Sequence, residues 1–355
     1  QGWFGGGFIP TPAVVSTVDR IDFSNDSVSA SPRGPLSSAR FGSGATSGQA
    51  KGPAIKLQKT GNYGWFGGGN LGTFVTTVDR IDFSNDSPTA SVRGSLSLAR
   101  SNLAATGNSN YGWFGGGFGA SATPIVDRID FSNDSTTASI RGPLSLAREG
   151  LAATGNSNYG WFGGGYAPTS YRSIVDRINF SNDSSTASPR SILSLARGSL
   201  AATGNSNYGW FGGGYTPTVS LRVDRIDFSN DSSTASVRGS LSSARAMLAA
   251  TGNSNYGWFG GGATPTVVST VNRINFSNDL AATSVRGPLN EINQRDKLAA
   301  TGNSNYGWFG GGSNPSKSTV DRINFSNDSV TASVRGPITP ATGRNYLAAT
   351  SNTPT

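Results

Sequence analysis

The residues of this sequence that could do chemistry are carboxylates, arginines and aromatics, because its 355 residues include no Cys and no His. The commonest general base and metal ligand is therefore missing, as are a thiolate nucleophile and a disulfide framework. This excludes Ser-His-Asp and Cys-His hydrolases, zinc enzymes and His-ligated iron. A carboxylate pair can hydrolyse a glycoside, but Glu149 and Glu291 are the only glutamates, and neither has an obvious partner. We therefore predict a protein that is not an enzyme and that holds no cofactor or metal.

The aromatic residues could bind sugars instead. The string Gly-Trp-Phe-Gly-Gly-Gly occurs seven times and contains every tryptophan: Trp3, Trp65, Trp113, Trp161, Trp210, Trp258 and Trp308. Exposed indoles would give a lectin with one equivalent sugar pocket per repeat. The alternative is packing, since large rings fill the space between layers where glycine lets backbones approach. Strict repetition fits both interpretations, and packing is favoured.

Oxygen-rich turns, such as the one from Asp130 to Ser135, follow one strand pattern in each repeat and could hold calcium. Their spacing is not that of an EF-hand loop, and Asn179, Asn275 and Asn324 replace an acid in three repeats. Asn and Asp also favour turns through hydrogen bonds from the backbone to their own side chains. We interpret these segments as turns.

The net charge of +8 raises the question of a nucleic-acid surface. Three arginines recur in each repeat, which accounts for 21 of the 28 basic residues, and 17 recurring acids accompany them. Arginine and carboxylate form bidentate pairs, so we expect these charges to pair within or between repeats. Spread over seven repeats, they form rings rather than one groove, and we predict no specific nucleic-acid partner.

The segments after the glycine triplets vary between otherwise similar repeats. Each joins the same two strand patterns, so all must lie at one end of the molecule. Variable loops on a rigid scaffold are typical of a binding surface, and sequence drift in a tolerant loop is the alternative. The candidate binding residues are the aromatic and basic ones: Phe8, Phe74, Phe118, Tyr166, Tyr171, Arg172, Tyr215 and Arg222. An insertion within 41–60 is a second irregularity and a candidate docking site for a neighbouring protein.

The elements that position these residues follow from the repeat. The tryptophan spacings of 62, 48, 48, 49, 48 and 50 define seven units of about 48 residues, one of them with an insertion. In the unit that begins at Leu151, strand patterns cover 151–154, 159–162, 174–180 and 186–190, separated by turn residues. Helical periodicity is absent. Four short strands per unit, with a glycine run after the second, are typical of a propeller blade.

We therefore predict an all-β, seven-bladed β-propeller with four antiparallel strands per blade, spanning residues 1–355 as a single domain. The blade cores begin near the seven tryptophans. The chain starts at a second strand (Gly2 to Phe4) and finishes with a first strand (Leu347 to Thr350). The C-terminal strand would thus join the N-terminal three and close the ring. An open solenoid would need atypical polar capping repeats, which the sequence lacks.

The order of these elements resembles the kelch-type repeat. An Arg, a short strand, an aromatic strand with a glycine cluster, Val-Asp-Arg-Ile-Asp-Phe and a basic fourth strand recur along the whole chain. The sequence departs from kelch in lacking the fourth-strand Trp, where Ser91 to Gly94 read Ser-Val-Arg-Gly. The motifs Trp-Phe-Gly-Gly-Gly and Asp-Arg-Ile-Asp-Phe-Ser-Asn-Asp also resemble repeats in virion proteins of tailed phages of marine bacteria and cyanobacteria.

This second resemblance implies a virion protein that is made in the host cytoplasm. We expect a non-enzymatic adhesion or decoration module of a phage tail, fibre or capsid, whose variable loops bind host surface glycan or a neighbouring virion protein. The alternative is the lectin-like propeller with equivalent pockets, and a third interpretation is an intracellular scaffold. No run of about 18 apolar residues predicts a membrane span, so we expect no membrane insertion.

Overall fold

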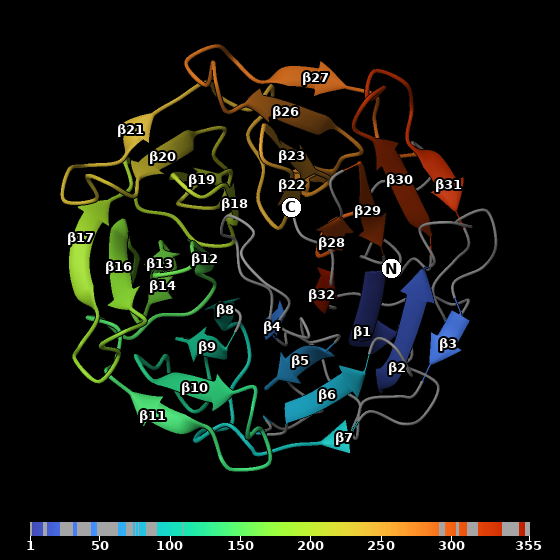
Figure 1. Cartoon of the computed structure of the whole chain (residues 1–355). Coiled ribbons are helices and arrows are strands. Elements are labelled where there is room, and N and C mark those ends of the chain that lie inside the picture. Colours follow the sequence, from blue (N-terminus) through green and yellow to red (C-terminus); the bar gives the residue numbers. More distant parts are fainter. Residues whose placement is uncertain are drawn as a thin grey trace, which may run out of the picture.

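The computed structural model is all-β, and its sheets stand around a common centre (Figure 1). It describes residues 91–108, 110–290, 295–302, 305–310 and 319–335 continuously. It also describes the segments 2–9, 13–21, 31–33, 44–47, 63–68, 78–82 and 348–351, with positions 74 and 76. The insertion predicted within 41–60 lies outside the described residues, apart from a strand over 44–47. The described part of the chain forms no helix that could span a lipid bilayer.

The described strands form seven four-stranded antiparallel sheets, in which the first strand lies nearest the centre (Figure 1). The first strands are β4 (Gly44–Ser47), β8 (Ala104–Gly107), β12 (Ala152–Gly155), β18 (Ala201–Gly204), β22 (Ala249–Gly252), β28 (Ala299–Gly302) and β32 (Ala348–Ser351). The second strands are β1 (Gly2–Ile9), β5 (Tyr63–Gly67), β9 (Tyr111–Gly115), β13 (Tyr159–Gly163), β19 (Tyr208–Gly212), β23 (Tyr256–Gly260) and β29 (Tyr306–Gly310).

The third and fourth strands complete each sheet toward the rim. The third strands are β2 (Ala13–Ile21), β6 (Val78–Asp82), β10 (Val126–Asp130), β16 (Ile174–Asn179), β20 (Val223–Asp227), β26 (Val271–Asn275) and β30 (Val320–Asn324). The fourth strands are β3 (Ser31–Arg33), β7 (Ser91–Val92), β11 (Ser139–Arg141), β17 (Ser188–Ile192), β21 (Ser236–Val237), β27 (Ser284–Arg286) and β31 (Ser333–Arg335). The prediction of four strands per repeat is confirmed, with boundaries shifted by one or two residues.

The first and last described strands of the chain belong to one sheet. β32 pairs with β1 antiparallel, with Trp3 opposite Thr350, in the sheet order β3-β2-β1-β32. The first strands also lie beside one another from sheet to sheet, and β32 has β28 on one side and β4 on the other. Segments from the two ends of the sequence are thus brought together in one four-stranded sheet.

The core lies between neighbouring sheets rather than within one. Trp161 and Val175 of one sheet share a buried cluster with Phe211, Ile226 and Phe228 of the next. The indole of Trp161 stacks on the ring of Phe228, with centroids 3.8 Å apart and planes 8° apart. The same stack recurs between other neighbouring sheets. Each repeat therefore buries its aromatic strand only when the next repeat is in place.

The glycine triplet is required by this packing. A Cβ on Gly163 would lie 2.8 Å from Cε1 of Phe211 in the next sheet, which is closer than real Cβ atoms come. Gly164 and Gly165 have φ of +69° and +106° and turn the chain out of β13. The triplet thus serves inter-sheet contact at its first position and a left-handed turn at its second and third.

Candidate functional site

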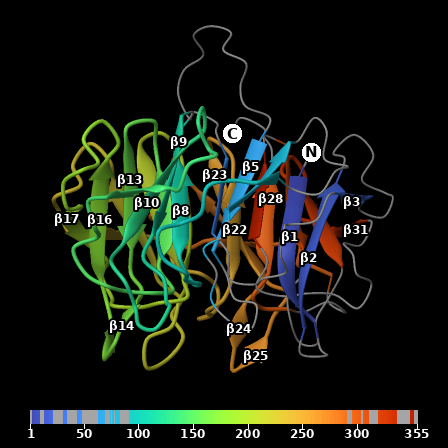
Figure 2. The same cartoon turned by 90° about the horizontal axis from the view of Figure 1, so that it is seen from below.

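The connections between second and third strands gather at one end of the molecule, which we call the variable face. The short strands β14 (Tyr166–Ala167), β24 (Ala263–Thr264) and β25 (Thr266–Val267) lie at this lower end in Figure 2. Four of the described connections begin with a residue anchored by backbone hydrogen bonds: Phe118, Tyr166, Tyr215 and Ala263. The N–H of Tyr166 donates to the carbonyl of Glu149 (2.8 Å), and the N–H of Glu149 donates back (2.9 Å). The scaffold therefore fixes the first position of these four variable segments.

Three of the predicted binding residues come together on this face. Tyr166 and Tyr171 are paired through β14 and β15 (Ser170–Tyr171), and their ring centroids are 5.0 Å apart at 61°. Tyr215 comes from the next sheet, and its ring lies 5.6 Å from that of Tyr171 at 68°. Burial raises the pKa of the Tyr171 hydroxyl, and Tyr215 and Tyr166 raise it further. Tyr215 is 40% exposed, so the cluster of three tyrosines presents aromatic surface to solvent.

Two further predicted residues form a separate contact. The rings of Phe74 and Phe118, from neighbouring repeats, lie edge to face with centroids 5.8 Å apart. Both are half-buried. Phe8 lies in β1, and its side chain is outside the described residues. The structure thus divides the predicted aromatic residues into two groups.

The predicted arginines lie on the same face as the tyrosines. Arg172 follows Tyr171 directly and is half-buried, whereas Arg222 is exposed. Neither lies within 4.0 Å of a carboxylate among the described residues. Arg222 donates one long hydrogen bond, from Nη1 to Oγ of Ser194 at 3.4 Å.

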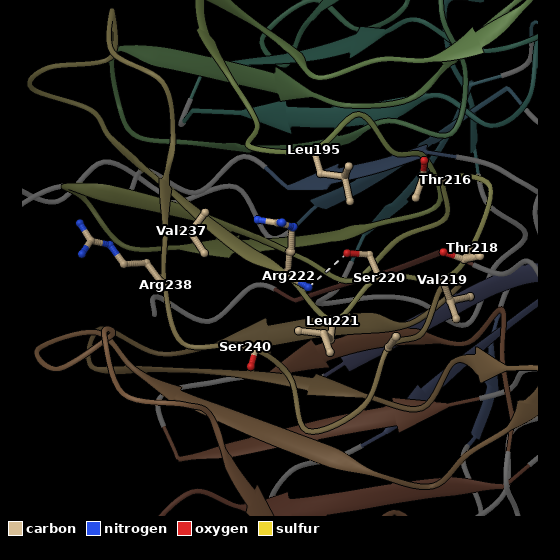
Figure 3. Close-up of a pocket in the computed structure, with 11 residues that line it drawn as sticks. Leu195, Thr216, Thr218, Val219, Ser220, Leu221, Arg222, Val237, Arg238 and Ser240 are labelled. Atoms are coloured by element: carbon tan, nitrogen blue, oxygen red, sulfur yellow. Dashed lines mark hydrogen bonds between the residues drawn. The ribbon is translucent and has the colours of Figure 1, made fainter.

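A hollow of about 390 Å³ lies next to Arg222 (Figure 3). Thr216, Thr218 and Ser220 line it from the variable segment, and Val219 and Leu221 add apolar surface. The remaining lining comes from the preceding repeat and from the fourth strand with the chain after it: Leu195, Val237, Arg238, Ser240 and Ala244. Hydroxyls, apolar side chains and one exposed guanidinium therefore meet in one concave place.

The repeated tryptophans lie elsewhere, in the contacts between sheets. The indoles of Trp65, Trp113, Trp161, Trp210, Trp258 and Trp308 are at most 1% exposed, and the side chain of Trp3 is outside the described residues. Side chains of the next sheet cover these rings, as Phe228 covers Trp161. The structure therefore gives the described tryptophans a packing role. These buried indoles expose no surface on which a sugar could stack.

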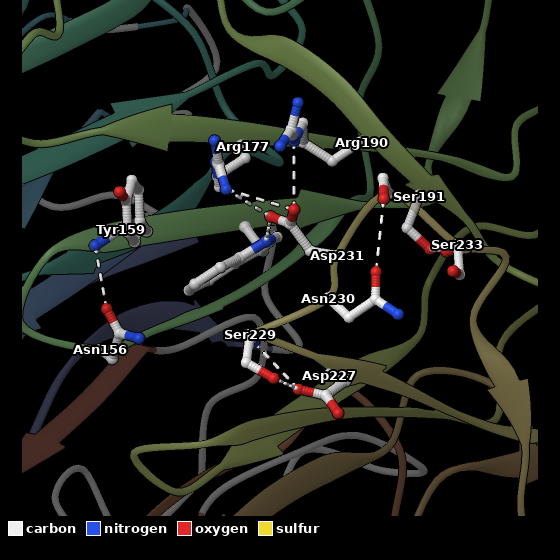
Figure 4. Close-up of polar contacts among 12 residues, drawn as sticks. Asn156, Tyr159, Arg177, Arg190, Ser191, Asp227, Ser229, Asn230, Asp231 and Ser233 are labelled. Carbon is white, nitrogen blue, oxygen red and sulfur yellow. Dashed lines mark hydrogen bonds and ion pairs between the residues drawn. The ribbon is translucent and has the colours of Figure 1, made fainter.

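The charges repeated in each unit also hold neighbouring sheets together (Figure 4). Asp231 accepts a hydrogen bond from the indole Nε1 of Trp161 at 2.8 Å. The same carboxylate accepts from Arg177 Nη1 at 3.0 Å and Arg190 Nε at 3.1 Å, both of the preceding sheet. The Arg177 guanidinium also covers the ring of Tyr159, 4.5 Å from its centroid. The expected pairing of repeated charges between repeats is confirmed for this part of the chain.

A third arginine lies in the connection before β18 and pairs with the sheet that β18 begins. Arg197 is fully buried, and its Nη1 donates to Oδ2 of Asp224 at 2.8 Å. Its Nη2 donates to the carbonyl of Phe211 (3.0 Å), and its Nε to that of Gly213 (2.6 Å). Burial lowers the pKa of Arg197, and the Asp224 carboxylate opposes that shift. Arg177, Arg190 and Arg197 are thus paired with carboxylates of the scaffold. Among the described residues, the arginines of the variable segments, Arg172 and Arg222, have no such partner.

The oxygen-rich turns use the side chain at their first acidic position within the turn, whereas the second acid, such as Asp231, binds the neighbouring sheet. Oδ1 of Asp130 accepts from the backbone N–H (2.9 Å) and the hydroxyl (2.7 Å) of Ser132. Asn179 makes the same two contacts with Ser181. Within the described ranges, no three acidic side chains gather in a way that could hold a metal ion. The amide serves in place of the acid because the turn needs only an oxygen acceptor.

One feature of the variable face escaped the sequence analysis. Just before the first strands, Asn102, Gly150, Ser199, Met247 and Lys297 all have φ between +52° and +61°. From Gly150 onward, each N–H in this series donates to the carbonyl of the preceding member, at 2.9 to 3.0 Å. These hydrogen bonds join backbone groups and the side chains differ, so no sequence pattern predicts them. The only signal is their constant place two residues after a buried arginine.

Comparison with known proteins bears on the fold. No protein-family model matches the sequence, and no curated protein matches it. The chain is similar in structure to the solved structure of YjhT, with a TM-score of 0.63 and 11% identity. The match covers 84% of this chain and 98% of that chain. Identity this low carries only the fold, and with the repeated four-stranded antiparallel sheets it identifies this chain as a β-propeller.

Proposed function

We propose that the chain is a closed, seven-bladed propeller of the kelch type that serves as a non-enzymatic binding module. Three observations support the ring: the seven four-stranded sheets, the completion of one sheet by β32, and the position of β32 between β28 and β4. The kelch assignment rests on the order of elements in each repeat. In this form the scaffold would be rigid, and its variable segments would be the parts free to differ.

The observation that carries the binding function is the tyrosine cluster. Tyr166 and Tyr215 occupy the first, anchored position of their variable segments, and Ala263 occupies that position in a neighbouring repeat. Because the scaffold accepts alanine there, an aromatic ring is not needed for folding. A tyrosine offers an apolar face and a polar hydroxyl at small entropic cost, which suits it to recognition.

We further propose that the module is carried on a virion and binds host surface glycan or a neighbouring virion protein. This part rests on the resemblance of the Trp-Phe-Gly-Gly-Gly and Asp-Arg-Ile-Asp-Phe-Ser-Asn-Asp wording to virion repeats of tailed phages. Many copies on one particle would turn weak single contacts into firm attachment. The lectin-like alternative would need pockets built from residues other than the buried tryptophans.

The test is binding of the purified full chain to a glycan array and to whole bacterial cells. The variant combines Tyr166→Ala, Tyr171→Ala and Tyr215→Ala, and a matched control combines Thr264→Ala and Thr266→Ala on the same face. Thermal unfolding of all three proteins checks that they fold. We expect the tyrosine variant to lose binding and the threonine control to keep it.

Binding that survives in the tyrosine variant would move the site away from the cluster and toward repeated pockets. If even the unchanged chain binds neither glycans nor cells, the adhesion proposal fails. The chain would then be a structural component of the virion, and cross-linking within the virion would identify the proteins next to it.

A further inference from the structure

Arg222 is an exposed cation, whereas most other arginines among the described residues contact a carboxylate. The repeated arginines of the same region contact carboxylates, as Arg177 and Arg190 contact Asp231 and Arg197 contacts Asp224. Arg222 has only the long contact to Ser194, and no acidic side chain lies within ion-pair distance in the described part of the chain. Its charge is also close enough to lower the pKa of Arg197, behind the larger effect of burial. Arg222 is therefore an exposed positive charge with no carboxylate partner among the described residues.

The hollow beside Arg222 has the lining of a small-ligand site. The labelled side chains of Thr216, Thr218, Ser220 and Arg222 lie around it in Figure 3, with Leu221 below them. The hydroxyl of Ser220 is engaged with the backbone N–H of Arg222 at 3.2 Å. A volume of about 390 Å³ falls near the small end of ligand pockets, which span roughly 300–1,000 Å³. That space suits one or two sugar rings.

An aromatic ring precedes the lining residues in the sequence, although it is not itself part of the lining. Tyr215 directly precedes Thr216, and its ring is held against Tyr171. The apolar face of a pyranose packs well on such a ring, while its hydroxyls bond to Ser and Thr side chains. A guanidinium adds recognition of a planar anionic group such as a carboxylate.

We infer that this hollow binds an anionic saccharide, a pyranose whose carboxylate or sulfate group contacts Arg222 while the adjoining ring rests at Tyr215. The inference rests on the proposed binding function and names its ligand class. The carbonyl of Arg222 accepts a hydrogen bond from the N–H of the second glycine of its triplet. In the other described repeats the residue that accepts this bond is Ile125, Ile174 or Thr270. Because none of these is charged, the described repeats offer one such site per chain.

The test is calorimetric titration of the full chain with three matched probes. These are a uronic-acid tetrasaccharide, its carboxyl-reduced neutral form, and the reduced form after sulfation. We expect the uronic-acid probe to bind with a stoichiometry of one, and about tenfold tighter than the neutral form. Binding should weaken as salt is raised. Preference for the sulfated probe over the uronic acid would identify sulfate as the anion and would also support the inference.

The variant Arg222→Gln should lose about tenfold in affinity for the charged probe and change little toward the neutral one. Arg222→Lys should keep part of the preference, because it retains the charge without the planar fork. Lys297→Gln removes one positive charge elsewhere in the molecule and should leave both affinities within about twofold.

Equal affinity for the charged and neutral probes, or an unchanged preference in Arg222→Gln, would overturn the inference. The neutral probe could instead bind the unchanged chain as tightly as the charged one does. If the combined variant Tyr166→Ala, Tyr171→Ala and Tyr215→Ala then loses that binding, the proposed function stands without the anion site. Absence of binding to every probe, to the array and to cells would overturn both. A stoichiometry near seven would point to repeated pockets and would also overturn the single site.

Discussion

At the scale of single residues, one buried arginine differs from its equivalents because its partner is an asparagine rather than an aspartate. In neighbouring sheets Arg148 contacts Asp176 at 2.9 Å and Arg197 contacts Asp224 at 2.8 Å. Arg245 is equally buried, but its partner is the amide oxygen of Asn272 at 2.9 Å. Nδ2 of Asn272 has no hydrogen-bond partner. Burial lowers the pKa of Arg245 to about 10, so this sheet carries a buried positive charge without a compensating carboxylate.

We expect Asn272→Asp to stabilise the protein by about 1.5–3 kcal/mol at pH 7, because an ion pair replaces the hydrogen bond from the Arg245 cation to a neutral amide. The matched control is Asp224→Asn, which recreates the same defect beside Arg197 and should destabilise by about 3–5 kcal/mol. Urea unfolding followed by tryptophan fluorescence measures both changes. A lower urea midpoint for Asn272→Asp would contradict the assignment of Asn272 as the weak partner.

The gain from Asn272→Asp should depend on pH in a defined direction. The pKa of Arg245 is lower in the folded protein than in the unfolded chain, so above about pH 10 the unfolded chain keeps a proton that the folded protein loses. In that window the stability contribution of Arg245 in the unchanged protein rises with pH. The advantage of the variant should therefore be full at pH 7 and shrink above about pH 10.

At the scale of the strand, a single side chain explains why β17 differs from its equivalents. Gly142 and Gly239 end the fourth-strand segment where the next repeat passes very close, and a Cβ on Gly239 would lie 1.5 Å from the carbonyl oxygen of Ala281. Ser191 stands at this position in one repeat. There the pairing of β16 and β17 shifts register between Val175 and Asp176, and the Ser191 hydroxyl donates to the carbonyl of Ser233 at 2.7 Å.

We expect Gly239→Ser to destabilise the protein by about 3 kcal/mol, because its sheet has no such shift and the added atoms must displace backbone. The reverse change, Ser191→Gly, loses one hydrogen bond and adds chain entropy, and should cost about 1–2 kcal/mol. Urea midpoints compare the two, and hydrogen exchange at 236–239 locates the damage. Equal costs would show that the register shift does not accommodate the serine.

Sequence patterns predicted these strands well and their tertiary contacts less well. Alternation and turn residues located β13 and β16 to within a residue, because both are local properties of the chain. The close approach at Gly239 and the left-handed series through Ser199 depend on a neighbouring repeat, which no local pattern encodes. The tyrosines were found because they vary where everything else repeats, but their mutual contact required the geometry of two adjacent sheets.

At the scale of the whole molecule, the pairing of β32 with β1 is the contact that joins the two ends of the chain. Without β32, the inner edge of β1 would lose its hydrogen-bonded partner, and the place between β28 and β4 would be empty. An unpaired strand edge is costly and invites association with other chains. The other described sheets keep all four strands, so the damage would begin at one place and spread only if the sheets unfold as a unit.

We therefore expect a chain that ends at Leu347 to melt at least about 5 °C lower than the full chain and to associate at high concentration. A chain that ends at Ser351 keeps β32 and should match the full chain. A synthetic peptide of residues 347–355 added to the shortened chain should restore the melting temperature, because it can occupy the vacated position beside β1. If the shortened chain melts with the full one, or if the peptide does not bind it, β32 does not hold the ends together and the closed ring fails. Restoration by the peptide would show that this one strand closes the ring.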